Sequence, residues 1–395
     1  MPPDASPARP LVCIDCRYIR DRPSGIAAVV RGLIDHAPEF APDLDFLLLK
    51  HPEVSGHLST APNVRDVVVR QATNGPASMW LLPHLIDLRG VALFHATANI
   101  LPAGLTMPCL TTIHDLMWLT RPEWAGGAGL WSRIEAAFYR HGIQRALRRS
   151  AAIATVSAAT REAIRDLDPA AAAKTHVTLS GVSSKFRRLP PDYAPAASAE
   201  PWTDRPYVLT VGQYSPYKNH RAVLEAFARA FGDRSEIRLV FVQRRGAGEA
   251  ALAPLAQSLG LADRVHFAAP LSDEGLVALY NDALLLCHPS LCEGFGNPLA
   301  EAMACGCPVV TSDLSAMPEV TGGAALLVDP RDVDAIAGAM RRIDDDPALA
   351  ADLRARGLAR AQALTWRNFA AANVALYRDL LAARLHRPGA AGDNA

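Results

Sequence analysis

The sequence predicts an α/β fold made of two domains. The chain has 395 residues, which is long for a single hydrophobic core. Short apolar runs alternate with amphipathic stretches along the chain, a pattern typical of mostly parallel sheets covered by helices. A strand, a loop with glycine and a helix follow one another near residue 11 and again near residue 207. We therefore expect two Rossmann-like domains.

The composition is that of an ordinary globular protein, with 50% hydrophobic and 20% charged residues. A formal net charge of zero argues against nucleic acid as a partner. The half up to residue 188 is mildly basic, which would suit contact with an anionic membrane surface. The chain lacks a run of about 18 apolar residues, and its Pro-rich start is unlike a signal peptide. We expect a cytoplasmic protein, at most peripheral to the inner face of the membrane.

Residues 1–188 form the first predicted domain, which opens with the strand LVCID at 11–15. Gly25 then precedes an amphipathic helix, and a loop of this kind often places backbone N–H groups beside a phosphate. A plain loop is the alternative. Cys13 and Cys16 form a C-x-x-C pair whose side chains would point to opposite faces of a strand. Since no second pair with metal spacing follows, we expect all seven cysteines to be reduced.

Further apolar runs of strand length continue this domain, at residues 44–49, 64–69, 93–97, 109–114, 153–157 and 177–179. His114 ends one of them, at the position where open α/β sheets place their ligand-binding groups. A lone histidine is more often structural, so His114 is a candidate only. His95, at the end of the preceding strand, is a weaker candidate.

Residues 129–149 predict a helix with apolar side chains on one face and arginines on the other. The apolar members are Leu130, Trp131, Ile134, Phe138 and Ile143. A basic amphipathic helix can rest on a membrane or hold a pyrophosphate-linked acceptor. A core helix with a solvated rim is the commoner arrangement, and we favour it.

Residues 189–206 are rich in Pro, Ala and Ser without periodicity, so they predict a linker. The second domain is expected over 207–364. Its first strand ends at Gly212, and Lys218 lies in the following loop, where a cation could neutralise a diphosphate.

The stretch 287–320 is the most informative part of the sequence. The apolar run 283–287 before it predicts a buried strand. Gly294 and Gly296 then allow the backbone to approach a ligand closely, and Pro298 suits a first helical position.

A helix over 299–305 follows, Gly306 ends it, and residues 309–311 predict the next strand. The Gly-rich turn and the helix start present N–H groups to a phosphate. Glu293 on the turn and Glu301 on the first helical turn would repel that phosphate unless they face hydroxyl groups. A sugar nucleotide has hydroxyls on both sides of its diphosphate. We hypothesise that Glu293 holds the sugar and Glu301 the ribose diol; two glutamates flanking an ordinary helix start are the alternative.

The segment EGFGNPLAEAMACGCPVV, with MPEV at 317–320, resembles the E-x7-E signature of retaining GT-B glycosyltransferases of family four. The resemblance implies two domains facing across a cleft, with a helix at 365–385 that crosses back to the first domain, followed by a tail to residue 395. It also implies a nucleotide-diphosphate sugar as donor substrate, no cofactor and no metal. Mannosyl or glucosyl transfer to a hydroxyl of a saccharide or lipid-linked acceptor is the expected reaction.

The same resemblance assigns roles to individual residues. His114 and Glu293 would be catalytic. The donor would be bound by Gly25, Gly212, Gln213, Lys218, Ala269, Leu271, Gly294, Phe295, Gly296, Asn297, Pro298, Leu299 and Glu301. Two positions depart from the family pattern, because Gln213 stands where many members have Arg and Ala27 where many have Gly.

Other functions share parts of this pattern. A dinucleotide-dependent oxidoreductase should show Gly-x-Gly-x-x-Gly after an early strand, and neither opening loop has it. A GT-B sugar-nucleotide epimerase would act without an acceptor, and a non-catalytic sugar-nucleotide-binding protein would only bind the donor. These two remain as alternatives to the transferase.

Overall fold

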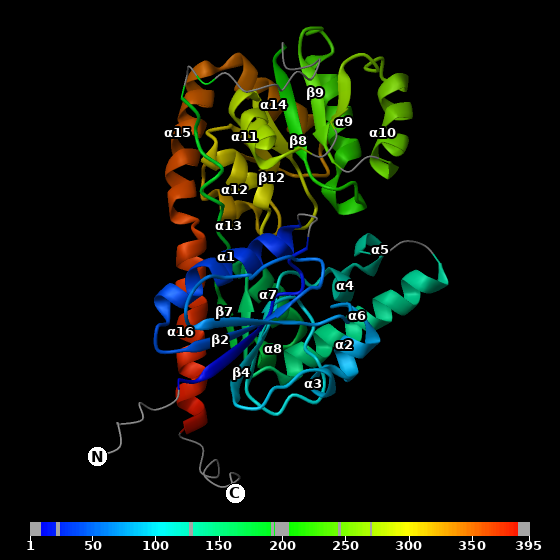
Figure 1. The fold of residues 1–395 in the computed structure, drawn as a ribbon. Coiled ribbons are helices and arrows are strands. Elements are labelled where there is room, and N and C mark those ends of the chain that lie inside the picture. The colour runs from blue at the N-terminus through cyan, green and yellow to red at the C-terminus, as the bar shows by residue number, and fades with distance from the viewer. Residues whose placement is uncertain are drawn as a thin grey trace, which may run out of the picture. The chain divides into compact units, whose positions relative to one another are not determined.

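Two parallel β-sheets, each in its own structural unit, form the framework of the computed structural model (Figure 1). Unit 1 comprises residues 1–181 and 366–395, and unit 2 comprises residues 182–365. The structure describes residues 9–20, 24–125, 129–190, 193, 205–243, 246–268 and 271–385.

Unit 1 contains a seven-stranded sheet in the order β3-β2-β1-β4-β5-β6-β7. The strands are β1 (Leu11–Asp15), β2 (Asp45–Lys50), β3 (Val64–Val68), β4 (Val91–Ala96), β5 (Cys109–Ile113), β6 (Ala152–Thr155) and β7 (Thr175–Val177). Each expected strand of this half is present, displaced by one or two residues at most. The order reverses between β1 and β4, which are neighbours in the sheet. In such sheets the ligand-binding crevice lies outside the carboxyl ends of the strands near this reversal.

The helices of unit 1 cover both faces of this sheet. They are α1 (Gly25–Phe40), α2 (Pro76–Trp80), α3 (Leu82–Leu85), α4 (Met117–Thr120), α5 (Pro122–Ala125), α6 (Leu130–Arg149), α7 (Ala158–Leu167), α8 (Pro169–Ala172) and α16 (Trp366–Leu385). Cys13 packs in the core on one face and Cys16 in the core on the other, as expected. All seven cysteines lie in the described part of the chain, and none of them forms a disulfide.

The last helix, α16, packs against α1, the first helix of the same unit. Gly32 of α1 lies so close to the Trp366 ring that a Cβ there would be 2.3 Å from Cδ2 of the indole. Phe369 and Tyr377 are fully buried in the core that also contains Leu33. The expected return of the last helix to the first domain is therefore confirmed. In the part of the chain that the structure describes, no helix is both long and apolar enough to cross a membrane.

Helix α6 packs into the core over only part of its length, so the favoured interpretation of a core helix was wrong for its first half. Ile143 is fully buried. Leu130, Trp131 and Ile134 are instead 71%, 81% and 50% exposed. The apolar stripe expected from the sequence thus leaves the protein core as it runs toward the start of the helix.

Unit 2 contains a six-stranded sheet in the order β10-β9-β8-β11-β12-β13. The strands are β8 (Tyr207–Val211), β9 (Arg238–Val242), β10 (Val265–Ala268), β11 (Leu285–His288), β12 (Val309–Ser312) and β13 (Leu326–Val328). The helical elements are η1 (Pro216–Lys218), α9 (His220–Phe231), α10 (Ala247–Ser258), α11 (Asp273–Asp282), α12 (Asn297–Ala304), α13 (Met317–Thr321), α14 (Val333–Asp345) and α15 (Pro347–Ala363). The order reverses between β8 and β11, so the crevice rule applies here too.

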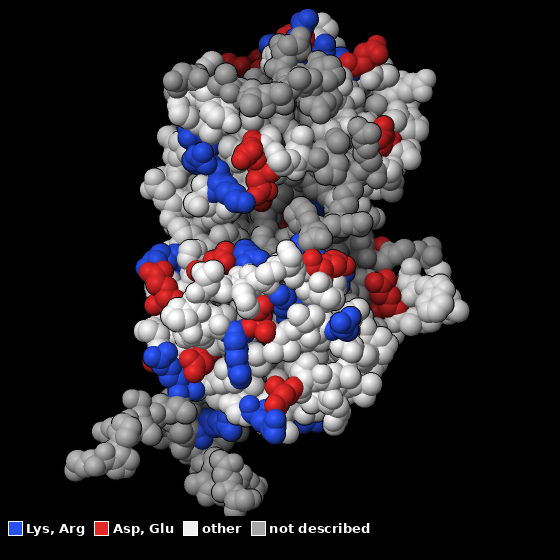
Figure 2. Space-filling model, viewed as in Figure 1, with Lys and Arg blue, Asp and Glu red and all other residues white. Residues whose placement is uncertain are grey.

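The boundary between the units lies slightly earlier than predicted. Val182 forms a parallel bridge with Thr365, and Lys185 pairs with Asp273 at 2.7 Å. These contacts place residues 182–188 in unit 2 instead of the first domain. Most of the predicted linker at 189–206 lies outside the described residues. On the face shown in Figure 2, acidic and basic side chains are interspersed, in keeping with the zero net charge.

Candidate functional site

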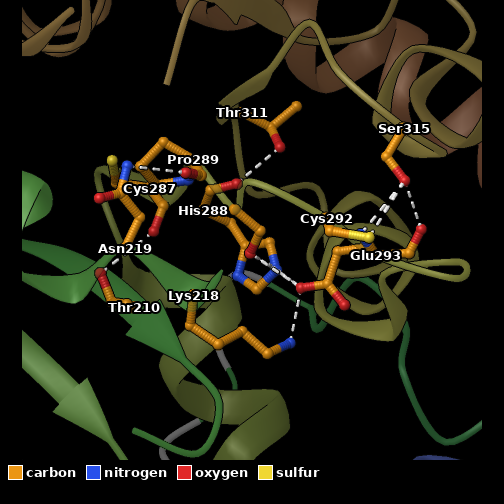
Figure 3. A network of polar contacts seen from close by, with 11 residues as sticks. Thr210, Lys218, Asn219, Cys287, His288, Pro289, Cys292, Glu293, Thr311 and Ser315 are labelled. Atoms are coloured by element: carbon orange, nitrogen blue, oxygen red, sulfur yellow. Dashed lines mark hydrogen bonds and ion pairs between the residues drawn. The ribbon is translucent and has the colours of Figure 1, made fainter. Parts of the chain in front are cut away.

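The residues singled out in the second half of the sequence meet at the carboxyl edge of the unit 2 sheet. Strands β8 and β11 are hydrogen-bonded neighbours. The loop after β8 contains Gly212 and Lys218, and the loop after β11 contains Ser290 and Glu293. Because parallel strands end at the same edge of a sheet, these two loops come together there (Figure 3).

Glu293 lies at the centre of this cluster. Its Oε1 accepts a hydrogen bond from Nζ of Lys218 at 2.6 Å and from Oγ of Ser290 at 2.8 Å. Nε2 of His288 is 2.9 Å from the same oxygen. A carboxylate can only accept, so this ring nitrogen carries the hydrogen. Figure 3 shows Lys218 and His288 pointing to one carboxylate oxygen of Glu293, a residue that is only 9% exposed.

The pKa of Glu293 reflects two opposing effects. Burial alone would raise it, but Lys218 and His288 more than offset burial and hold the pKa below its ordinary value. Burial lowers the pKa of His288, so its ring is neutral at neutral pH. Glu293 is therefore ionised, and Lys218 is its counter-ion.

The backbone around this cluster is fixed by side chains from other loops. Oγ of Ser315 donates to the carbonyl of Glu293 at 2.7 Å and accepts from its N–H at 3.3 Å. Nδ2 of Asn219 donates to the carbonyl oxygens of Pro289 and Pro330, at 3.2 and 2.7 Å. The Lys218 and Glu293 loops are thus held in place before any ligand binds.

The Gly-rich turn leads into α12 as predicted, with its start free of side-chain capping. Gly296 has a φ of +92°, a conformation that favours glycine, and Pro298 lies in the first turn. No side chain caps the N-terminus of α12. Pro298 has no N–H, and the N–H of Leu299 donates to the carbonyl of Gly296 at 2.9 Å, so within the first three residues the N–H of Asn297 is the one that could meet an anion at the positive end of the helix. The helix ends at Ala304, and Gly306 has a φ of +72°.

Four of the predicted donor-binding residues on this segment differ in exposure. Phe295 and Leu299 are buried in the protein, so a ligand could meet only their backbone groups. Asn297 is half-buried at the first helical position. Gly294 is also half-buried, in the turn before it.

Glu301 lies in the second turn of α12, so its predicted place in the first turn was wrong. The hydroxyl of Tyr280, a fully buried residue of α11, donates to Oε2 of Glu301 at 3.0 Å. Burial raises the pKa of Glu301 to about 7, although Tyr280 and Lys218 both act to lower it. The pKa values of the two glutamates are therefore shifted in opposite directions, so that Glu293 is held ionised and Glu301 exchanges its proton near neutral pH.

The remaining candidates of unit 2 lie around the same edge. Gly212 has a φ of +142°, and a Cβ there would lie 3.6 Å from Cε of Lys218. Gln213 is exposed, and Leu271 is half-buried. Ala269 lies outside the described residues.

In unit 1, His114 directly follows β5 and is tied to neighbouring loops. Its backbone N–H donates to Oδ1 of Asn99 at 2.7 Å, and its Nε2 is 2.8 Å from the carbonyl oxygen of Thr97. A carbonyl accepts only, so Nε2 carries the hydrogen and Nδ1 is the basic nitrogen. Burial lowers the pKa of His114, which favours the neutral ring.

Gly25 is the first residue of α1. Oγ of Ser24 caps this helix by accepting from the N–H of Ala27 at 3.1 Å. One of the N–H groups expected to meet a phosphate is therefore already satisfied. The predicted apposition of His114 and Gly25 to the unit 2 site stays a prediction.

His95 has a structural environment. Its Nδ1 is 2.7 Å from the hydroxyl of Tyr377, and its Nε2 is 2.8 Å from Oγ1 of Thr112. The ring is fully buried between the sheet and α16. The sequence interpretation of His95 as the weaker functional candidate agrees with these contacts.

Sequence reasoning missed four residues of the unit 2 site: Tyr280, His288, Ser290 and Ser315. His288 and Ser290 could have been found, because His288 ends the buried strand β11 and Ser290 lies two residues beyond it, at the edge where such sheets place ligand-binding groups. Tyr280 sits in an ordinary helical pattern, so its sequence context gives no signal of its contact with Glu301.

Comparisons with known proteins agree with this geometry. The model of the family "Glycosyl transferases group 1" matches residues 196–360, which include the unit 2 site. The O-antigen chain mannosyltransferase B of Escherichia coli is 30% identical over 288 residues, covering 72% of this chain and 74% of the relative.

Solved structures share the two-domain fold. Sucrose-phosphate synthase from Thermosynechococcus elongatus superposes with a TM-score of 0.72 at 24% identity, over 95% of this chain and 100% of that chain. Anabaena HepE in complex with UDP and glucose gives a TM-score of 0.70 at 18% identity, over 94% and 100%. These likenesses establish the GT-B fold. With the mannosyltransferase relative matched over most of its length and the family model covering the site, the chain belongs to the group 1 glycosyl transferases and is a glycosyltransferase.

Proposed function

We propose that this glycosyltransferase moves a hexose, of the mannosyl or glucosyl type, from a nucleotide-diphosphate sugar to a hydroxyl of a saccharide or lipid-linked acceptor. The observation that carries the proposal is the buried Lys218–Glu293 pair beside the uncapped start of α12. A cation and the positive end of a helix suit a diphosphate, and the carboxylates suit hydroxyls. The mannosyltransferase relative and the UDP and glucose of HepE support the donor class.

In this proposal the negative charge that develops on the leaving diphosphate is stabilised by Lys218 and by the positive end of α12, including the N–H of Asn297. The reaction then needs no metal and no cofactor. Glu301 accepts from the ribose hydroxyls, and Glu293 accepts from the transferred sugar. Lys218 neutralises Glu293 in the empty site and, once the donor binds, lies between two anionic groups.

Retention of configuration is part of the proposal. Oε1 of Glu293 already accepts from Lys218, Ser290 and His288, an arrangement suited to orienting hydroxyls and less suited to nucleophilic attack. We therefore favour front-face attack by the acceptor, whose proton passes to the leaving phosphate. Nδ1 of His114 is the proposed acceptor for a sugar hydroxyl, because Nε2 is committed to Thr97.

A donor panel tests the proposal directly. Purified protein is screened by thermal shift against nucleotide sugars, and the donor that binds is assayed for transfer. Glu301→Ala should weaken nucleotide binding, whereas Glu293→Ala should reduce transfer more than binding. Glu225→Ala is a matched control, since this glutamate pairs with Arg221 on the exposed side of α9. Parent-like binding and transfer in both site variants would refute these roles.

We also propose that the start of α6 contacts an anionic membrane that presents a lipid-linked acceptor. Trp131 is 81% exposed, and α6 carries five arginines against one glutamate. The exposed apolar side chains at the start of the helix suit the boundary of a bilayer, and the four arginines further along it, at 140–149, suit anionic headgroups. Trp131→Ser should reduce co-sedimentation with vesicles containing phosphatidylglycerol, and Leu167→Ser, an exposed apolar position on α7, should not. Equal sedimentation of Trp131→Ser and the parent would overturn the contact.

A further inference from the structure

Glu301 and Tyr280 form a contact that the proposed donor site does not by itself require. Tyr280 lies on α11, and Glu301 lies on the facing helix α12. The phenol ring is fully buried and packs edge-on against Phe186 at a centroid distance of 6.0 Å. Its hydroxyl donates to Oε2 of Glu301 at 3.0 Å.

We propose that Tyr280 is a positioning residue of the donor site, which fixes the Glu301 carboxylate through Oε2 and leaves Oε1 to accept from the ribose hydroxyls. This inference rests on the proposed function. A carboxylate on a half-buried helix position has several rotamers, and a hydrogen bond from a rigid buried ring selects one of them. The selected rotamer would lower the entropic cost of binding a diol.

The proton states on both sides of the contact fit this role. Burial raises the pKa of Tyr280 far above its ordinary value, so the hydroxyl keeps its proton and remains a donor. Burial raises the pKa of Glu301 to about 7, while the Tyr280 hydrogen bond acts in the opposite direction. A donor to Oε2 stabilises the carboxylate over the protonated acid, and only the carboxylate accepts hydrogen bonds on both oxygens.

Other charged and titratable groups also act on Glu301. Asp273 of α11 raises its pKa and Lys218 lowers it. The Cys305 thiol, one turn further along α12, is kept neutral because burial raises its pKa to about 12. Asp273 is paired with Lys185 at 2.7 Å, which moderates its effect. These groups are unchanged by substitution of Tyr280, so they affect the parent and the variant alike.

Tyr280→Phe isolates the hydroxyl. The ring that fills the core is kept, and the pKa of Glu301 should rise by about one unit on loss of the donor. The dissociation constants of UDP and GDP are measured by calorimetry from pH 6 to pH 9. For the nucleotide that binds, the variant should still be about twofold weaker than the parent at pH 9, where Glu301 is ionised in both proteins, because its rotamer is no longer fixed. At pH 7 the variant should be about tenfold weaker, because the raised pKa leaves about fivefold less of the carboxylate form that binds.

Three controls separate positioning from a general loss of structure. Tyr207→Phe also removes a buried hydroxyl, which donates to the carbonyl of Leu279 on α11, at 2.8 Å. It should lower the unfolding temperature without moving the pH midpoint of binding. In a Glu301→Gln background, Tyr280→Phe should cause no further change in the pH profile. The 2′,3′-dideoxy nucleoside diphosphate, which lacks the diol, should bind the parent and Tyr280→Phe equally.

The outcomes distinguish this inference from the proposed function. If the parent binds neither nucleotide at pH 9, the donor site itself is wrong. If the parent binds but the midpoint of Tyr280→Phe is unchanged, the positioning role is wrong. Should Tyr280→Phe fail to fold, 3-fluorotyrosine placed at position 280 supplies the test, because a stronger donor should move the midpoint to lower pH.

Discussion

Replacing Lys218 by an uncharged residue should destabilise the protein without ligand as well as its complex with the nucleotide. The Lys218 and Glu293 side chains are 11% and 10% exposed, and their charged atoms are 2.6 Å apart. Removing one partner of a buried ion pair costs about 3–5 kcal/mol, because the other charge remains buried and unpaired. In Lys218→Met, His288 and Ser290 still donate to Glu293, so we expect the lower end, about 3 kcal/mol. For a domain of the size of unit 2 this corresponds to a fall of about 6–12 °C in unfolding temperature.

A double-mutant cycle identifies the pair as the cause. Glu293→Gln removes the buried negative charge and keeps an oxygen that can accept from His288 and Ser290. The double variant Lys218→Met with Glu293→Gln should therefore be more stable than the sum of the single effects predicts, by about 2 kcal/mol. Arg221→Met breaks an exposed ion pair and serves as the control, with a change below about 0.5 kcal/mol.

The effect of Lys218→Met should also depend on pH. The pKa of Glu293 is held below its ordinary value of 4.5. Its contribution to stability is therefore fully present above pH 4.5 and is lost as pH falls through the lower pKa of the folded state. The gap in unfolding free energy between the parent and Lys218→Met should be largest near pH 7 and shrink in acid. A Lys218→Met protein as stable as the parent at pH 7, with an additive cycle, would refute the reasoning.

Three further predictions concern unit 1 and its last helix. Gly32→Ala should lower the free energy of unfolding by about 1–3 kcal/mol, because the added Cβ overlaps the Trp366 ring. The control is Gly338→Ala, at an exposed position on α14 with open space around it, which should raise the free energy of unfolding by about 0.5–1 kcal/mol. Urea denaturation measures both. Burial lowers the pKa of His95 to about 3, so below its ordinary value of 6.5 the unfolded chain gains a proton that the folded one excludes. Through this group the free energy of unfolding of the parent should fall by up to about 1.4 kcal/mol per pH unit as the pH is lowered from 6.5 to 3. His95→Gln should make this pH dependence shallower in urea unfolding measured at a series of pH values. An equal pH dependence in the parent and the variant would contradict the role of His95. Tyr377→Phe, which leaves Nδ1 of His95 unpaired, should cost about 1–2 kcal/mol at pH 7 in the same assay.

Much of the fold was predictable because its signals are local. Strand positions follow from short apolar runs, and glycine and proline mark the ends of helices. Gly296, Pro298 and Gly306 fix the turn and helix around the site through backbone preferences that any neighbouring sequence would share. The meeting of the Lys218 and Glu293 loops was also predictable in outline, since both follow parallel strands at one edge of a sheet.

The other features depend on contacts between distant segments. Tyr280 reaches Glu301 because α11 packs on α12, and the spacing of apolar residues in either helix does not specify which side chains meet. The α6 prediction failed for a related reason. Its apolar stripe extends past the body of unit 1, and periodicity alone cannot tell where the supporting core ends.

The position of the Lys218–Glu293 pair at the proposed diphosphate site explains why an energetically costly buried ion pair would be kept in this protein. A buried ion pair is on average a weak source of stability compared with apolar residues of the same volume. At a diphosphate site, however, a lysine already removed from water and held by Glu293, whose carboxylate also accepts from His288 and Ser290, has lost most of its freedom before the ligand arrives. The ligand then meets an oriented cation without the cost of ordering it. Glu293→Gln removes this ordering of Lys218 but also frees the cation from its counter-ion, and the two effects oppose each other; we therefore expect nucleotide binding to change little while transfer falls. A variant that instead lost nucleotide binding would show that Glu293 holds Lys218 in place and has no separate role in transfer.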